Sequence, residues 1–228
     1  MTDDRRTEPA VPDEHGPSRP TAKSAETRAR IVAGALRALE THGLGQTTTR
    51  RIAEESDIRL ATLHYHFSSK EAVLLAVLEM MIDDMTATLT ARTRSSDALE
   101  ARIAFILQAS WSYVEQTRAK QIVQYELTLY AVRTKGCEWL AARQYQAYIG
   151  AYVDLLSGRR ASPELAAADA EDLARLMLAG IDGLILQSLA GASECDLRAS
   201  VEALTVGVQA RAARLSPRGA RPKRIAAA

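Results

Sequence analysis

The chain has 228 residues, of which 47% are hydrophobic and 25% charged, a composition typical of a globular protein with one large domain or two small ones. No run approaches the roughly 20 uninterrupted apolar residues of a membrane helix, and the polar, proline-rich N-terminus lacks the apolar segment of a secretory signal. The two cysteines have neither disulfide nor metal-site spacing. We therefore expect a cytoplasmic protein with no metal, no cofactor and no membrane partner.

Nearly the whole chain after residue 23 is predicted to be helical, because apolar residues recur at three- and four-residue spacing and alternating β-branched runs are absent. The first helix is expected over about 24–42, with Gly43 placed as a left-handed cap. A long helix is expected to start at Ser68, which has capping-box spacing to Glu71. Between them lie two short helices, near 48–55 and 59–67. Further helices are expected near 97–117, 120–132, 137–157, 168–190 and 195–214.

The two short helices, joined by a tight link and packed on the first helix, have the form of a helix-turn-helix. Such a unit places its second short helix, here "RLATLHYHF", in the DNA major groove. Leu63 and Phe67 are four residues apart and are expected to anchor this helix to the core. Net charge supports a division of the chain, because residues 24–70 carry +2 and residues 71–210 carry −6. An ordinary solvated surface also accounts for a +2 segment.

His64 and His66 lie in this helix. Residues two apart point to nearly opposite sides of a helix, so the pair cannot chelate one metal ion. A catalytic dyad also lacks a recognisable nucleophile motif. Two interpretations stay open: one histidine buried and hydrogen-bonded with the other exposed, or contact with nucleic-acid phosphates, which we favour.

The segment "TRARIVAGALRALETHGLGQTTTRRIAEESDIRLATLHYHFSSKEAVLLAVL" resembles the N-terminal domain of the TetR family of transcriptional repressors over about residues 24–78. The resemblance implies an all-α homodimer that binds a palindromic DNA operator and releases it when a small-molecule effector enters a C-terminal bundle. It also implies DNA-contacting residues: Thr48, Thr49, Arg50, Arg59, Leu60, Thr62, His64, Tyr65, His66 and Lys70. This chain departs from the family pattern at Asp57, where glycine is usual, and at Arg59, where a serine cap is usual.

The fold class that follows is all-α, with an N-terminal three-helix helix-turn-helix domain and a C-terminal antiparallel helical bundle for ligand binding and dimerisation. We expect four segments in the chain. They are a disordered arm (1–23), the helix-turn-helix domain (24–70), the helical ligand-binding and dimerisation domain (71–215) and a basic disordered tail (216–228).

Eight of the eleven aromatic residues fall between 111 and 152, which indicates either a ligand pocket or an aromatic packing face. Glu126 lies among apolar residues, so its carboxylate must find a partner or shift its pKa. Arg133, Arg143 or a ligand could be the partner of the Glu126 carboxylate. The predicted pocket residues are Gln108, Trp111, Tyr125, Glu126, Trp139, Arg143 and Tyr148. An aromatic, lipophilic effector is expected.

Two apolar stripes in the last two helices predict a four-helix dimer interface, with packing inside the chain's own bundle as the alternative. The predicted interface residues are Leu173, Leu176, Gly180, Leu184, Leu197, Val201, Leu204 and Val208. The function expected is a non-enzymatic, ligand-responsive repressor. The rival is a helical enzyme that uses Glu126 and a nearby tyrosine as acid and base. These sequence patterns do not distinguish a repressor from an activator, or from a regulator that is controlled by a protein partner.

Overall fold

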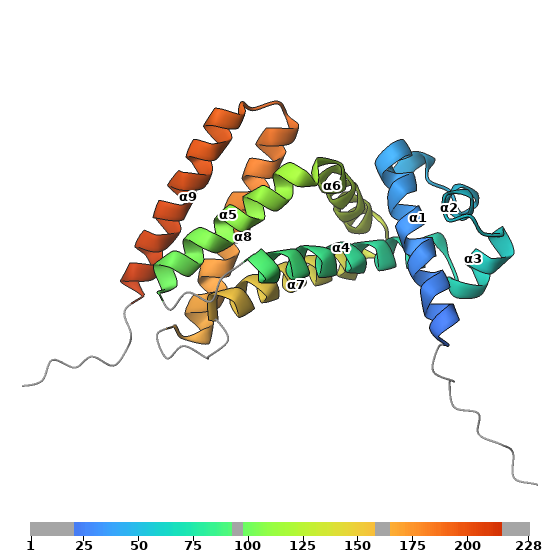
Figure 1. Cartoon of the computed structure of the whole chain (residues 1–228), viewed down its shortest axis with the longest axis horizontal. Helices are drawn as coiled ribbons and strands as arrows, with labels where there is room; N and C mark the ends of the chain where they lie inside the picture. Colours follow the sequence, from blue (N-terminus) through green and yellow to red (C-terminus); the bar gives the residue numbers. More distant parts are fainter. Residues whose placement is uncertain (1–20, 93–97, 158–164, 216–228) are drawn as a thin grey trace, which may run out of the picture.

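The computed structural model describes residues 21–92, 98–157 and 165–215, which contain nine α-helices and no strand (Figure 1). The helices are α1 (Ala22–Gln46), α2 (Thr49–Glu55), α3 (Leu60–His66), α4 (Lys70–Arg92), α5 (Leu99–Gln116), α6 (Arg118–Arg133), α7 (Glu138–Ser157), α8 (Ala167–Leu189) and α9 (Glu194–Arg214). The all-α prediction is confirmed. Most of the predicted arm and all of the predicted tail lie outside the described residues.

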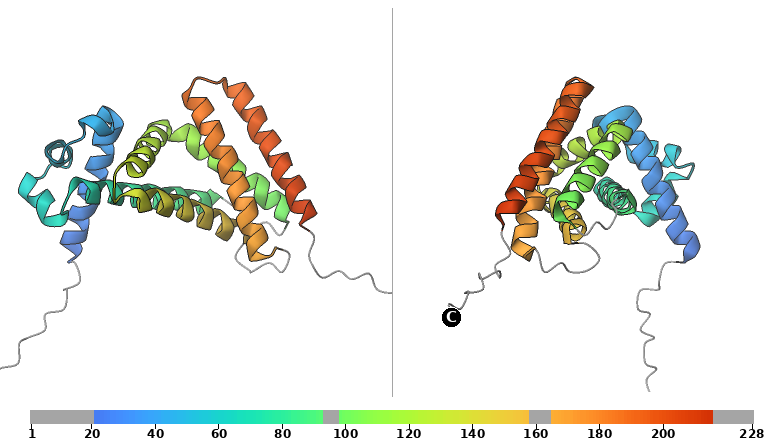
Figure 2. Two further views of the ribbon diagram at one scale, coloured as in Figure 1. Left: turned by 180° about the vertical axis from the view of Figure 1, so that it is seen from behind. Right: turned by 60° about the vertical axis from the view of Figure 1, so that its left-hand side comes forward.

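Helices α1–α3, called the head below, lie at one end of the molecule, and α8 and α9 lie at the other (Figures 1 and 2). Helices α4 and α7 run side by side between the two ends. Helix α6 packs against α1 and α7 and also touches α8, so it spans from the head to the far bundle. Both α4 and α6 therefore contact the head directly through α1.

The boundaries of the helices in and next to the head follow from local chemistry. Thr21 and Thr48 cap α1 and α2, each accepting a hydrogen bond from a backbone amide three residues on. Gly43, predicted as the left-handed cap of the first helix, instead lies within α1 at a kink with φ 70° and ψ 168°, and the cap residue of α1 is Thr47. Asp57 adopts the left-handed region at a φ of 50°. The cap of α4 is Ser69, whose Oγ accepts from the Ala72 amide, which corrects the predicted cap at Ser68.

Two apolar cores hold the chain together. The first joins the head to the first half of α4 and continues into α6 and α7 through Val123, Leu127 and Leu140, so it crosses the boundary expected at residue 70. The second fills the bundle of α4, α5 and α7–α9. Gly34 permits close contact inside the head, because a Cβ there would lie 2.1 Å from the Ser56 Oγ.

Candidate DNA-binding surface and effector site

Helix α3 presents an exposed aromatic side chain on a firmly held scaffold. Leu63 and Phe67 are buried in the head core, as predicted, while Tyr65 on the opposite side is 84% exposed. A tyrosine this exposed contributes nothing to the core, so its hydroxyl and ring are available to a partner. The Arg28 guanidinium lies 4.1 Å from the Phe67 ring centre and donates to the His66 carbonyl at 3.3 Å, which fixes the C-terminal end of α3.

The histidines of α3 are placed differently from each other. His64 is exposed, whereas His66 is half-buried and its ring meets the Tyr65 ring edge to face at 5.2 Å. Arg59 caps α3 without a side-chain hydrogen bond, as its departure from the family pattern predicted. Leu60 and Thr62 are half-buried on the same short helix.

Helix α2 carries the neighbouring polar side chains. Thr48 and Arg50 are exposed, and Thr49 is half-buried. Within the described residues Arg50 makes no hydrogen bond or ion pair, whereas the adjacent Arg51 donates to the Gln46 carbonyl at 3.1 Å. The Arg50 guanidinium is thus available for a bidentate contact with a guanine edge or a phosphate.

The head is tied to the body through the two backbone groups of Leu44. The Leu44 amide donates to Glu126 Oε2 of α6 at 2.9 Å, and the Leu44 carbonyl accepts from Lys70 Nζ of α4 at 3.3 Å. The carboxylate also lies close to the positive-φ Gly43, where a Cβ would be 3.3 Å from Glu126 Oε1. Glu126 therefore belongs to this junction, and its partner is the Leu44 amide, not Arg133 or Arg143.

A small pocket lies between α4, α5, α6, α7 and α8. We call it the chamber. Its volume is ≈ 30 Å³, about that of one water molecule. The residues that line it are Met85, Ser110, Tyr113, Val114, Gln121, Gln124, Tyr148, Tyr152, Leu178, Ile181, Asp182 and Ile185. Of the seven predicted pocket residues, only Tyr148 lines the chamber, and Tyr125 reaches its edge by hydrogen-bonding Asp182.

Hydrogen bonds hold the polar groups of the chamber. Tyr148 donates to Gln124 Oε1 at 2.9 Å and Tyr152 donates to Ser110 Oγ at 3.0 Å. The Tyr125 hydroxyl lies 3.1 Å from the Asp182 carbonyl oxygen and 3.3 Å from its carboxylate. Burial raises the pKa of Tyr152 to about 12, and it also raises the pKa of the Asp182 carboxyl above its ordinary value. The chamber is thus a largely apolar, aromatic site with one acidic group and a few hydrogen-bonded polar groups.

The other predicted pocket residues lie elsewhere. Gln108 and Trp111 line a surface groove between α5 and α9, while Trp139 is 52% exposed and donates to the Gly136 carbonyl. Arg143 pairs with Glu79 at 3.1 Å on the exposed surface of α7 and α4. These residues were predicted to share a pocket because they are close in the sequence, but the packing of the helices directs them to separate surfaces.

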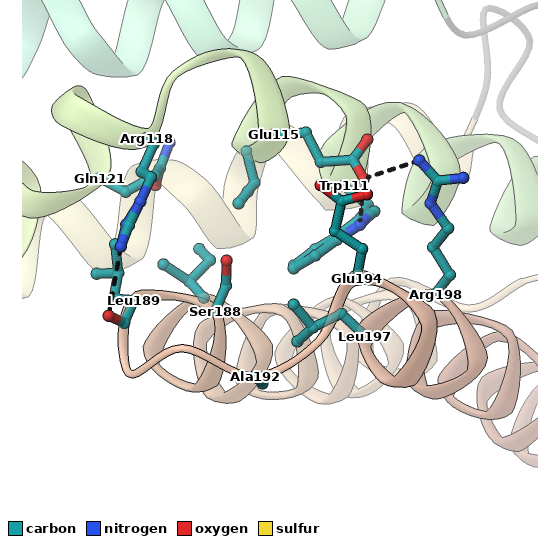
Figure 3. A pocket seen from close by; sticks show the side chains of 12 residues that line it. Trp111, Glu115, Arg118, Gln121, Ser188, Leu189, Ala192, Glu194, Leu197 and Arg198 are labelled. Carbon is teal, nitrogen blue, oxygen red and sulfur yellow. Dashed lines mark hydrogen bonds and ion pairs between the residues drawn. The ribbon is translucent and has the colours of Figure 1, made fainter.

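Figure 3 shows the groove beside α5, the start of α6 and the α8–α9 turn, a cavity of ≈ 490 Å³. Three of its four charged side chains have partners. Glu115 accepts from the Trp111 indole at 3.2 Å and pairs with Arg198 at 3.7 Å, and Arg118 donates to the Leu189 carbonyl at 3.4 Å. The groove is larger than the chamber, but its two acidic and two basic side chains balance in net charge, so it offers less basis for selecting a ligand by charge.

The residues predicted for the dimer interface divide into two groups. Leu173, Leu184, Leu197, Val201 and Val208 are buried inside the chain, so they have no surface to offer a partner. Gly180 and the half-buried Leu204 pack on one another, since a Cβ at Gly180 would lie 2.5 Å from Leu204. Only Leu176 is exposed. Most residues predicted to form the dimer interface therefore pack α8 and α9 against each other and against the rest of their own bundle.

Two regions of the sequence match described families. Residues 31–77 match "Bacterial regulatory proteins, tetR family", and residues 94–211 match "Tetracyclin repressor-like, C-terminal domain". The second match alone covers more than half of the chain. The chain belongs to the TetR family. It is a transcriptional regulator with a helix-turn-helix head and a helical ligand-binding domain, and these matches favour a regulator over the helical enzyme based on Glu126.

Individual relatives share this TetR-family architecture. The nicotine-responsive transcriptional repressor HdnoR of Paenarthrobacter nicotinovorans is 22% identical over 171 residues, 74% of this chain and 87% of the relative. The transcriptional regulator TtgR of Pseudomonas putida is 28% identical over 182 residues, 78% and 87% of the two chains. Among solved structures, the multidrug binding protein EbrR complexed with ethidium has a TM-score of 0.61 and 26% identity, covering 79% of this chain and 97% of EbrR.

Asp182, the acidic residue that lines the chamber, was not among the pocket residues predicted from the sequence. Asp182 stands in "LAGIDGLIL", where a lone carboxylate in an apolar helix is a detectable signal, but the segment was assigned to dimerisation. Across residues 21–92, 98–157 and 165–215, no cluster of three or more His, Cys, Asp or Glu side chains is arranged to hold a metal ion. In the same ranges no helix has the length and apolar character to span a membrane.

Proposed function

We propose that this protein is a repressor that binds a palindromic operator as a homodimer and is released by a small-molecule effector. The observation that carries the proposal is the 84% exposure of Tyr65 on a helix whose other side is buried through Leu63 and Phe67. A helix held in this way suits insertion into a major groove, where side chains meet base edges.

The DNA surface consists of the exposed side of α3 and the start of α2. Tyr65, Thr62 and Leu60 meet bases or the sugar–phosphate backbone, and Arg50 supplies a guanine or phosphate contact. The remaining contacts are Thr48, Thr49, Arg59, His64, His66 and Lys70. Lys70 Nζ also holds Leu44, so its phosphate contact is coupled to the position of α1.

The homodimer forms through the outward face of α8 and α9 at the end distant from the head. Leu176, Leu186 and Val206 are exposed large apolar side chains on this face. Small residues accompany them, and all are exposed: Ala179, Ala199, Ala203, Gly207 and Ala210. Small side chains let helices approach closely, and a two-fold axis here gives the two heads the symmetry of a palindrome.

The effector binds in the chamber and is aromatic and lipophilic. Tyrosines supply much of the lining, and HdnoR is named as nicotine-responsive while EbrR is complexed with ethidium, both aromatic compounds. At ≈ 30 Å³ the chamber is too small for such a molecule, so binding requires the helices around it to separate. Enlargement of the chamber is the conformational change that the effector selects.

Release of the operator follows from the position of α6 and α4, which lie between the chamber and the head. Both helices border the chamber, and both bond to Leu44 at the end of α1. Separation of these helices reorients the head, so that the two recognition helices of a dimer no longer match successive major grooves. An effector need favour the enlarged state by only about 3–5 kcal/mol to empty the operator.

Selection of bound duplexes from a random double-stranded pool, followed by fluorescence anisotropy on the enriched sequence, tests the DNA part of the proposal. We expect an inverted repeat whose affinity falls as salt rises. Failure to retain any duplex at low ionic strength would refute DNA binding. Enrichment of a single half-site, with one chain bound, would refute the dimer.

A further inference from the structure

We propose that the chamber recognises organic cations and that the Asp182 carboxylate is the group that selects them. The inference rests on the proposed function, because it names the chemical class of the effector. It goes beyond an aromatic or lipophilic ligand by requiring a positive charge.

Within the described residues no lysine, arginine or histidine forms an ion pair with the Asp182 carboxylate. Its partners are the hydroxyls of Tyr125 and Tyr145. A neutral hydroxyl compensates a carboxylate less than a cation does, so the chamber retains an unbalanced negative charge in a partly desolvated place.

Aromatic side chains surround that charge. Tyr113, Tyr148 and Tyr152 line the same cavity. Tyrosine rings attract a cation through their electron-rich faces, and they cover the apolar part of an organic cation as well. The amide groups of Gln121 and Gln124 add oxygen acceptors. An anionic ligand would meet the Asp182 carboxylate and is excluded by repulsion.

Asp84, the other acidic residue near these tyrosines, already has a cationic partner. Asp84 accepts from the Tyr113 hydroxyl at 3.3 Å, but Lys120 Nζ lies 2.6 Å from the same carboxylate oxygen and neutralises it. Asp84 and Asp182 thus each accept from a tyrosine hydroxyl beside the chamber. They differ in their charge partners, because Lys120 forms an ion pair with Asp84, whereas no cationic side chain of the described residues pairs with Asp182.

Isothermal titration of the DNA-free protein with matched probe pairs tests the inference. The pairs are N-methylquinolinium with 1-methylnaphthalene, and benzyltrimethylammonium with neopentylbenzene, which differ mainly in a nitrogen or carbon centre. We expect at least one cation to bind about tenfold or more tightly than its neutral partner. If no cation binds more tightly than its isostere, the inference is overturned.

Asp182→Asn keeps the size of the side chain and removes its charge. We expect the cation preference to fall to within about threefold in this variant and to persist in the matched control Asp84→Asn. A folded Asp182→Asn protein that keeps the full preference contradicts the assignment.

A second variant, Tyr125→Phe, removes a hydroxyl from Asp182 without removing the charge, and it serves if Asp182→Asn does not fold. A preference that persists supports the carboxylate, whereas its loss assigns recognition to the hydroxyl and overturns the inference. Operator binding is measured separately by anisotropy, so cation binding without operator release refutes the effector role and leaves the cation site intact.

Discussion

Tyr125 and Glu126 are neighbours in α6, yet they hold opposite parts of the molecule. The Tyr125 hydroxyl bonds to Asp182 of α8 at the chamber, and the Glu126 carboxylate accepts from the Leu44 amide at the end of α1. Successive residues of a helix point about 100° apart, so one turn of α6 contacts both the chamber and the head. A rotation or shift of α6 changes both contacts together.

Glu126→Ala is expected to weaken operator binding and to lower stability. It leaves the Leu44 amide without its acceptor, which costs about 1–3 kcal/mol for a buried donor and less here, where the site is partly buried. Thermal melting and operator anisotropy measure the two effects. Glu79→Ala, which breaks an exposed pair with Arg143, serves as the control and should cost less than about 1 kcal/mol. Unchanged melting and affinity in Glu126→Ala would show that the junction does not depend on this bond.

Arg50→Ala is expected to weaken binding to the selected operator more than binding to a random duplex, by about 1–3 kcal/mol of discrimination. The physical reason is that a guanidinium without a partner among the described residues can pair with a guanine edge. Arg51→Ala is the matched control, since that side chain is engaged with the Gln46 carbonyl. Equal losses on both duplexes would mean that Arg50 only contacts phosphates.

Val206→Glu is expected to convert the protein to a monomer and to reduce operator affinity at least about tenfold. Val206 is 64% exposed on the outward face of α9, where a charge would be desolvated by a partner subunit. Light scattering at micromolar concentration measures the mass. Val132→Glu, a similarly exposed site at 59% on α6, is the control and should remain dimeric. If the Val206→Glu protein remains dimeric, the dimer interface lies on another surface.

Stability is expected to depend on pH through Asp182. Burial raises the pKa of this carboxyl in the folded state, so its charged form opposes folding at neutral pH, and the penalty disappears as pH falls through the raised pKa. Asp182→Asn should therefore be more stable than the natural protein at neutral pH, by about 1 kcal/mol. Melting curves between neutral pH and about pH 4 should show this advantage shrinking. An advantage that grows on acidification would contradict the assigned pKa direction.

The sequence alone determined the helices and the family-like head. Apolar spacing places each helix, and Leu63 and Phe67 anchor α3 because residues four apart share a face. These features depend on residues that are close in the chain, where local geometry is fixed. The exposure of Tyr65 follows from the same periodicity.

Only the tertiary structure decided the roles of Glu126, Asp182 and the two stripes of α8 and α9. The partner of Glu126 lies 82 residues away, and the tyrosine at Asp182 lies 57 residues away, so no sequence period connects them. Helix α8 is apolar around much of its circumference, and spacing cannot tell which of its sides meets its own bundle. Packing of α5, α7 and α9 against one side settles that choice, because close packing leaves only the opposite side open to a second chain.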